Sequence, residues 1–238
     1  MNRWSIYIDV EGFSEIYKRR QRDAILALGE LMEALFFVAS KKFSTAPERL
    51  FMHQFGDGFV VVSDFIEPTP QRPIAICLAI MRHLIGRGVA TKAAISGGDF
   101  ADISSCYPER VLAASQDRRH VNIGEGVMTI IPVMGMALIA PYKLANRRSG
   151  AVLLLDSTIF VSLPIGVIAQ PGSPAVIDWI HSVFPLVTEV AKTAGLVTPD
   201  ASVTEAHLQS YIDDNRSTLG ADWITSTLES VGMASSSL

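Results

Sequence analysis

Two aspartates stand where carboxylates could meet to bind a metal ion. Asp9 ends a segment of alternating apolar and polar residues, and Asp57 lies in a Gly-Asp-Gly turn between two apolar runs. Carboxylates at separate strand ends of one sheet can converge on Mg²⁺, which takes a couple of carboxylates and completes its octahedron with substrate phosphates and water. Residues 11–14 lead into a helix N-terminus, where free N–H groups and the helix dipole favour anions. Together these residues predict a site for a metal ion and phosphate oxygens.

Each aspartate also has a purely structural interpretation. An aspartate at a strand end is commonly a turn or capping residue, and Asp-Gly is favourable turn chemistry in any hairpin. Asp9 or Asp57 taken alone therefore does not establish a metal site, and the hypothesis depends on their combination.

The elements that must position these aspartates alternate between strand-like and helix-like segments. In residues 4–10 the apolar side chains point one way and Asp9 points the other, which is the period-2 pattern of a strand. Residues 50–65 are predicted to form a hairpin, because Asp-Gly between apolar runs is a strong turn signal. Strands are also predicted for residues 90–96 and 151–155, and a further strand is predicted to open at residue 168. Helices are predicted for residues 14–43, 73–84, 135–148, 187–196 and 204–231.

The long predicted helix has apolar residues spaced by three and four, which indicates one buried face. That face carries Ile25, Leu28, Met32, Leu35 and Ala39. Residues 101–126 are poorly patterned and are interpreted as a lid or as a segment without a readable pattern. The order of these predicted elements indicates one α/β domain. We expect a catalytic part over residues 1–185 and a C-terminal helical extension over residues 186–238 that packs on it.

Composition excludes several functional classes. The chain has 238 residues, of which 49% are hydrophobic and 18% charged, so a disordered chain is excluded and apolar surface is left over for a partner subunit. The net charge of −4 argues against nucleic-acid binding, and two cysteines cannot make a disulfide framework. No unbroken apolar stretch reaches about 20 residues, and no signal peptide is recognised, so we expect no membrane insertion and a cytoplasmic location.

Four motifs in order resemble the class III nucleotidyl cyclases. Residues 8–14 are similar to the family strand Asp-Ile-x-x-Phe-Thr/Ser, and residues 55–59 to its hairpin with Gly-Asp at the tip. Residues 92–98 resemble the strand Arg-Val-Gly-Ile-His-Ser-Gly, and residues 135–147 the helix with an Asn-x-x-x-Arg pair. The resemblance covers about residues 4–156. It implies a ferredoxin-like α/β (α+β) catalytic domain with a mainly antiparallel sheet flanked by helices.

The resemblance also implies roles for the matching residues. Asp9 and Asp57 would hold two divalent metal ions, Mn²⁺ or Mg²⁺, with the carbonyl of Val10 as a further ligand. Lys92 would bind phosphate, and Arg147 would stabilise charge that develops in the transition state. The amides offered to phosphate would be those of Gly12, Phe13 and Ser14.

Three positions depart from the family pattern. Lys143 replaces the transition-state Asn, so either it contacts phosphate or the ribose is positioned differently. His53 stands at the position of the purine-selecting Lys and Met136 at that of the base-selecting Asp, which argues against an ATP cyclase. The structural alternatives are a solvated helix face for Lys143 and Arg147 and a satisfied strand histidine for His53.

Within the family, the chain most resembles the stand-alone Pycsar pyrimidine cyclases of bacterial antiphage defence, through residues 135–144 and 178–181. This resemblance implies a homodimer that converts UTP, or next CTP, to the 3′,5′-cyclic monophosphate and pyrophosphate. The aspartates of each site would come from one subunit and Arg147 from the other. A separate effector would read the cyclic product as a second messenger.

Two alternatives remain open. Residues 97–100, Gly-Gly-Asp-Phe, are similar to the hairpin signature of diguanylate cyclases, although the acidic pair is incomplete. The other is a degenerate cyclase-homology domain that binds nucleotide or dimerises without turnover. Lys143 favours this alternative, whereas Asp9, Asp57 and Arg147 argue against it.

Overall fold

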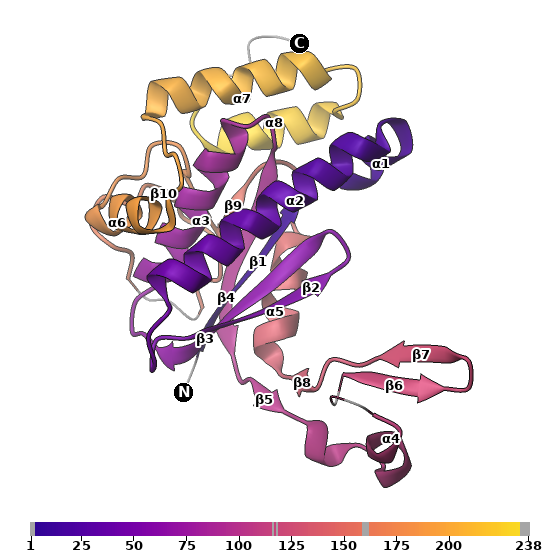
Figure 1. Cartoon of the computed structure of the whole chain (residues 1–238). Helices are drawn as coiled ribbons and strands as arrows, with labels where there is room; N and C mark the ends of the chain where they lie inside the picture. The colour runs from indigo at the N-terminus through magenta and orange to yellow at the C-terminus, as the bar shows by residue number, and fades with distance from the viewer. Residues whose placement is uncertain (1–2, 116, 118, 159–161, 234–238) are drawn as a thin grey trace.

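A seven-stranded sheet with helices on both faces forms the centre of the molecule (Figure 1). The computed structural model describes residues 3–115, 117, 119–158 and 162–233. The elements in chain order are β1 (Arg3–Val10), α1 (Phe13–Arg19), α2 (Gln21–Phe37), the π-helical turn η1 (Val38–Lys42), β2 (Leu50–Phe55), β3 (Gly58–Ile66), α3 (Gln71–Ile85), β4 (Thr91–Gly98), β5 (Ala101–Asp102), the 3₁₀ turn η2 (Ser104–Cys106), α4 (Glu109–Ala113), β6 (His120–Ile123), β7 (Gly126–Thr129), β8 (Val133–Met134), α5 (Met136–Ala145), β9 (Leu153–Leu155), β10 (Ala169–Gln170), β11 (Ala175–Ile177), α6 (Pro185–Ala194), α7 (Ala201–Asn215) and α8 (Ala221–Ser230).

The strand order is β10-β11-β9-β4-β1-β3-β2. Strand β1 pairs antiparallel with both β3 and β4, and β2 and β3 form the predicted hairpin. Only the β4–β9 pair is parallel. The expected α/β class, with a mainly antiparallel sheet flanked by helices, is therefore confirmed.

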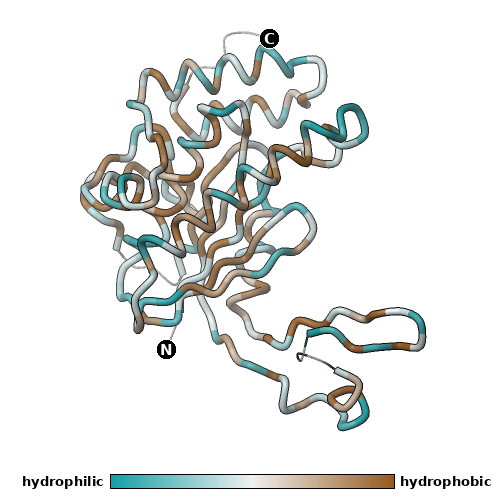
Figure 2. The backbone as a smooth tube through the Cα atoms, viewed as in Figure 1, coloured by the Kyte–Doolittle hydropathy of each residue, from teal (hydrophilic) through white to brown (hydrophobic). Residues whose placement is uncertain are grey.

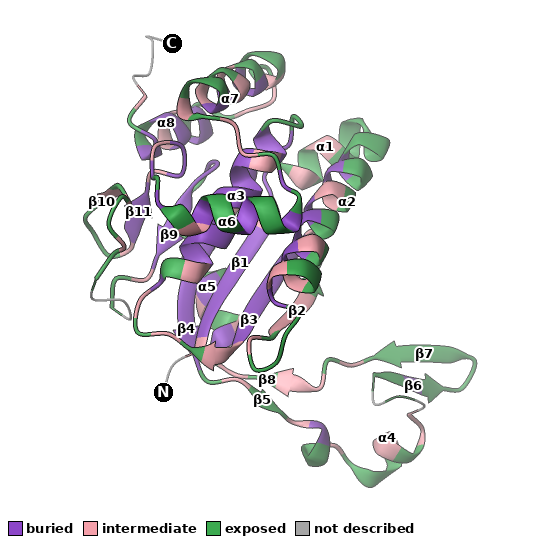
Figure 3. Ribbon diagram, turned by 60° about the vertical axis from the view of Figure 1, so that its left-hand side comes forward, coloured by how far each residue is buried: buried purple, intermediate pink, exposed green. Residues whose placement is uncertain are grey.

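The two faces of the sheet pack against different helices, as the alternation in β1 requires. Ile6 and Ile8 belong to the large core cluster that also takes in α2 and α3. Tyr7 belongs to a second cluster with Ala137 and Leu144 of α5. Figure 3 shows the central strands buried between these layers. Asp9 shares the alternation of Tyr7, so it lies on the α5 face, as the sequence predicts.

The long predicted helix over residues 14–43 is wrong in two respects. It is divided at Arg20, whose φ of −144° and ψ of 72° are not helical, into α1 and α2. Its buried face also differs, because Ile25 and Met32 are 53% and 44% exposed. The face that packs on the core is rich in small residues, which let the helix approach its neighbours closely. Its buried residues are Ala24, Ala27, Leu31, Ala34 and Leu35.

The described residues between positions 99 and 135 form an arm that projects from the sheet (Figure 1). The segment interpreted as a lid or an unreadable loop contains short strands and helical turns, and the hairpin β6–β7 lies at its end. Both β6 and β7 are almost wholly exposed (Figure 3). Their exposed side chains include the apolar Ile123, Val127 and Met128, and Figure 2 shows hydrophobic segments along this arm. The arm leaves apolar surface available for a partner.

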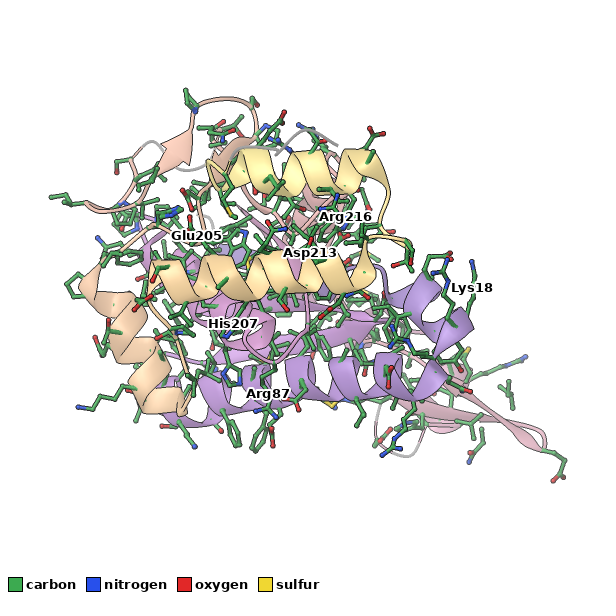
Figure 4. The ribbon with its side chains drawn as sticks, turned by 90° about the horizontal axis from the view of Figure 1, so that it is seen from above. Lys18, Arg87, Glu205, His207, Asp213 and Arg216 are labelled. Atoms are coloured by element: carbon green, nitrogen blue, oxygen red, sulfur yellow. The ribbon has the colours of Figure 1, made fainter. Side chains whose placement is uncertain are left out.

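The C-terminal helices pack on the same core as the sheet. The predicted helical stretch over residues 204–231 is divided into α7 and α8, which lie along one another above α2 and α3 in Figure 4. His181 links this layer to the part of the chain before residue 185, since its imidazole contacts Asp178 at 2.8 Å and Glu205 of α7 at 3.0 Å. The division at residue 185 stays a prediction. None of the helices in the described ranges is long and apolar enough to span a bilayer.

Candidate active site

The β-sheet register brings Asp9 next to the Gly-Asp-Gly turn. Asp9 lies opposite Gly58 of β3 on one side and Lys92 of β4 on the other. Asp57 directly precedes Gly58, so the turn presents its half-buried side chain beside the end of β1. The charge of Asp57 is one of the influences that raise the pKa of Asp9, which places the two carboxylates within electrostatic reach of each other.

Gly58 is required by packing against Tyr7. A Cβ atom at this position would lie 2.7 Å from Cε2 of Tyr7, a distance that forces one of them to move. The Tyr7 ring lies edge-on to Tyr142 of α5, with ring centroids 5.3 Å apart, and its hydroxyl interacts with Asp9. Burial, followed by the charge of Asp9, raises the pKa of Tyr7 well above its usual range. Tyr7 is therefore a neutral hydrogen-bond donor beside the Asp9 carboxylate.

The carboxylate of Asp9 has a strongly raised pKa. Burial, followed by the charge of Glu11, raises its pKa to about 7, against the opposing influences of Lys92 and Tyr7. Its Oδ1 atom is buried and has no hydrogen-bond partner within the described residues. A buried carboxylate oxygen without a partner costs free energy, and a bound cation would remove that cost.

The raised pKa predicts how the stability of the metal-free protein changes with pH. Protonated Asp9 stabilises the fold below its unfolded pKa of 3.8, and this contribution is lost as the pH rises through about 7. Asp9→Asn should therefore raise the melting temperature at pH 8 by about 5 °C, and by less at pH 5. Thermal unfolding in the presence of a chelator measures both values. An equal change in melting temperature at the two pH values would show that folding does not disfavour the ionised form of Asp9.

The turn after β1 presents the start of a helix beside Asp9. Gly12 adopts the left-handed conformation, with φ of +72°, and α1 begins at Phe13 without a side-chain cap. The first amides of a helix have no acceptor within the helix, so those of Phe13 and exposed Ser14 are available to a ligand. Val10, in contrast, buries its side chain in the core, which leaves only its backbone for the predicted role. The roles of these residues stay predictions.

Lys92 lies opposite Asp9 in the register of β1 and β4, but its ammonium is already paired. Its ammonium forms an ion pair with Glu11, and the exposed fractions of the two side chains are 13% and 9%. The other carboxylate oxygen of Glu11 accepts a hydrogen bond of 2.7 Å from the indole N–H of Trp223 in α8. Sequence reasoning missed this network, because no local pattern joins Glu11 to Trp223, which lies 212 residues further along the chain. A buried carboxylate requires partners, but the sequence does not say which ones.

Lys143 and Arg147 lie on the exposed side of α5 and just beyond its end. Neither side chain makes a hydrogen bond or ion pair with the described part of the chain. The neighbouring Arg148, in contrast, bonds to Ser226 and Glu229 of α8. Lys143 and Arg147 are thus cations without a partner among the described residues, and these contacts do not test their predicted catalytic roles.

His53 lines a cavity of about 690 Å³ between the hairpin and the base of the arm. Its Nε2 atom is buried and has no partner among the described residues, and its ring lies 6.0 Å from that of Phe100. Burial, followed by the charge of Arg119, lowers the pKa of His53. The imidazole is therefore neutral and offers one donor and one acceptor. Met136, at the other position expected to face the base, is 49% exposed.

The Gly-Gly-Asp-Phe segment is not a hairpin turn. Gly97 and Gly98 lie within β4, paired with β1. A Cβ atom at Gly98 would lie 2.7 Å from the amide nitrogen of Ala137, so this glycine lets α5 begin close to the strand. Asp99 accepts a hydrogen bond of 2.9 Å from the amide of Met136 at the start of the same helix. The segment is explained by helix packing and does not support the diguanylate interpretation.

The oxygen donors at this site fit a hard divalent cation if water or a bound molecule supplies the remaining donors. Asp9 and Asp57 are two carboxylates, and Asp9 has an unpartnered oxygen. No group of three or more His, Cys, Asp or Glu side chains could hold a metal ion within residues 3–115, 117, 119–158 and 162–233. Mg²⁺ commonly takes its remaining ligands from water and substrate phosphates. The pair therefore fits an ion that completes its coordination with water or, when a triphosphate is bound, with phosphate oxygens.

Comparison with known proteins finds likeness only among solved structures. Neither a protein-family model nor a curated protein sequence matches the chain. The guanylyl cyclase Cya2 is 14% identical, with a TM-score of 0.44 over 74% of this chain and 90% of that chain. The guanylyl cyclase domain of the RhoGC fusion protein from the aquatic fungus Blastocladiella emersonii is 11% identical, with a TM-score of 0.46 over 74% and 92%. A bacterial light-regulated adenylyl cyclase is 9% identical, with a TM-score of 0.47 over 82% and 57%.

Proposed function

We propose that this protein is a metal-dependent nucleotide cyclase that converts a pyrimidine nucleoside triphosphate, UTP before CTP, to its 3′,5′-cyclic monophosphate and pyrophosphate. The observation that carries the proposal is the buried, unpartnered oxygen of Asp9 beside Asp57 and the uncapped start of α1. Two carboxylates next to free helical amides suit a cation bound to a triphosphate.

The reaction is an intramolecular phosphoryl transfer. The ribose 3′-oxygen forms a bond to the α-phosphorus, its proton passes to solvent, and the bond to the departing pyrophosphate breaks. Divalent ions, when bound, lower the pKa of the 3′-hydroxyl and neutralise the leaving phosphates. Asp9 and Asp57 hold the ions, the amides of residues 12–14 orient the phosphates, and Arg147 stabilises charge on the transferred phosphorus.

The preference for a pyrimidine rests on His53 and Met136, which replace the polar residues expected to read a purine. A neutral imidazole can donate to or accept from the edge of a smaller base. Because UTP presents N3–H and O4 where CTP presents N3 and N4–H₂, His53 alone is compatible with both. We further propose, from the sequence resemblance, that the product is a second messenger in antiphage defence, read by a separate effector.

A homodimer with shared sites is part of this proposal. Lys143 and Arg147 have no partner among the residues that the structure describes, and the arm and α2 expose apolar side chains such as Ile25 and Val127. Burying this surface against a second copy would stabilise the dimer and bring Arg147 to the aspartates of the partner. Residues 1–185 would form the catalytic domain in each subunit, with residues 186–238 as its extension.

Incubation with each of the four nucleoside triphosphates and Mn²⁺ tests the proposal directly. We expect cyclic UMP and pyrophosphate in equal amounts, a slower reaction with CTP, and little product from ATP or GTP. Chromatography of the nucleotides against cyclic standards measures the outcome. A chelator should stop the reaction, because the two carboxylates cannot neutralise the triphosphate themselves. Purine cyclisation at a higher rate would contradict the assigned specificity.

The second candidate is a degenerate cyclase-homology domain that binds nucleotide or dimerises without turnover. It is favoured by Lys143 in place of Asn and by the ion pair that occupies Lys92. Binding of a triphosphate, measured by calorimetry, with no cyclic product from any of the four nucleotides would support this candidate over the first.

A further inference from the structure

A chain of contacts runs from the C-terminal helix α8 to the candidate metal site. The indole N–H of Trp223 donates to one oxygen of Glu11, and the other oxygen of Glu11 pairs with Lys92. Lys92 in turn lies opposite Asp9 in the register of β1 and β4. Residues 212 positions apart in the sequence are thereby joined beside the carboxylate that would bind the cation.

The position of Glu11 depends on packing in the C-terminal layer. Trp223 and Glu11 are only 7% and 8% exposed, and the Trp223 ring packs against Tyr211 of α7, with centroids 6.1 Å apart. An indole has a single N–H donor, so a buried tryptophan can direct only one hydrogen bond. Bonds to an ionised carboxylate are among the stronger ones. The core around α7 and α8 therefore fixes where the Glu11 carboxylate lies.

Lys92 has two carboxylates within reach but pairs with one. Residues opposite each other on antiparallel strands have Cβ atoms about 5 Å apart, which a lysine side chain spans easily. The lysine nevertheless forms its ion pair with Glu11, and Asp9 has no ion pair with any described residue. If Glu11 were displaced, Asp9 would be the nearest carboxylate in the register for the Lys92 ammonium.

We infer that Trp223 is a positioning residue of the metal site: by holding Glu11, it draws Lys92 away from Asp9 and keeps the Asp9 oxygen free for a divalent cation. The inference rests on the proposed function, because it takes Asp9 as a metal ligand. It assigns the C-terminal extension a role in metal affinity. That role is separate from any contact of Lys92 with phosphate, since it operates before nucleotide binds.

The test is Mn²⁺ binding to the whole purified protein without nucleotide, measured from the electron paramagnetic resonance signal of free Mn²⁺. Trp223→Phe keeps an aromatic ring but removes the N–H, and it should raise the Kd about tenfold or more. Trp179→Phe is the matched control, because Trp179 is equally buried and donates to the backbone carbonyl of Ala151 at 2.8 Å. This control should bind Mn²⁺ as the wild type does. Thermal unfolding of each variant checks that the fold is retained.

A second pair of variants separates positioning from a general structural effect. Glu11→Gln should weaken Mn²⁺ binding as Trp223→Phe does, because it removes the charge that holds Lys92. Adding Lys92→Gln to Trp223→Phe should restore binding, since the competing ammonium is gone. Unchanged binding in Trp223→Phe, an equal loss in Trp179→Phe, or no restoration by Lys92→Gln would overturn the inference. Failure of the wild type to bind Mn²⁺ would overturn the proposed metal site itself, and the inference with it.

Discussion

Asp57→Ala should abolish cyclisation, with a loss of about a thousandfold or more, while the fold and the dimer are kept. Asp57 lies in a turn at the sheet edge and contributes no buried apolar contact, so its removal costs little stability. In the proposed reaction, however, its carboxylate is one of the two that would bind the ions of the triphosphate. Without it the ions that neutralise the phosphates lose a ligand, and phosphoryl transfer depends on that electrostatic stabilisation.

The measurement is the initial rate of cyclic product with saturating Mn²⁺ and nucleotide, with size-exclusion chromatography for the dimer. Gln54→Ala is a matched control in the same hairpin, because its side chain bonds to the carbonyl of Gly56 at 2.9 Å and is exposed. This control should retain most of the activity, which would exclude distortion of the turn as the cause. Normal turnover by Asp57→Ala would show that the metal assignment is wrong.

Mixing two inactive variants should restore activity if each site is shared between subunits. In a heterodimer of Asp57→Ala and Arg147→Ala, one site lacks both groups and the other lacks neither. Equal amounts that exchange at random give half heterodimers, so we expect about a quarter of the wild-type rate. Each variant alone should be almost inactive, because a site without its aspartate or its arginine cannot stabilise the transferring phosphorus.

The exchange must be verified, for example with a different affinity tag on each variant and co-purification of both. Mixing Asp57→Ala with Asp9→Asn provides the control, because both changes affect the aspartate side of the site. Every site of this heterodimer then lacks one of the two carboxylates although Arg147 is intact, so no activity should be recovered. No recovery in the first mixture, despite verified heterodimers, would mean that Arg147 acts within its own protomer or not at all.

Short-range patterns predicted the part of the fold that holds the aspartates. The alternation in β1 and the Asp-Gly turn are local signals, because a strand buried on one face and a two-residue turn each restrict the residues that can occupy them. The structure therefore places Asp9 on the expected face and Asp57 at the expected hairpin. The same local segment also predicts a helix shortly after β1, and α1 begins at Phe13.

The remaining features of the fold and of the site depend on contacts that local sequence patterns do not encode. The face of α2 was wrong because alanines, rather than Ile25 and Met32, pack closely on the core. The pairing of Lys92 with Glu11, and of Glu11 with Trp223, joins residues distant in the sequence. The arm was not recognised because its strands are short and, apart from the buried Val121 of β6, the side chains of β6 and β7 are exposed, so these strands show no regular alternation between a buried and an exposed face.

The two carboxylates of the site differ in the rigidity of the backbone that carries them. Asp9 lies near the end of β1, an interior strand of the sheet, where amide hydrogen exchange is slow in proteins, whereas Asp57 follows the edge strand β2, which opens more easily. An ion held by both must immobilise the hairpin tip, and the entropy lost there lowers its affinity. A substitution that stiffens the tip in its bound shape would tighten metal binding without adding any ligand.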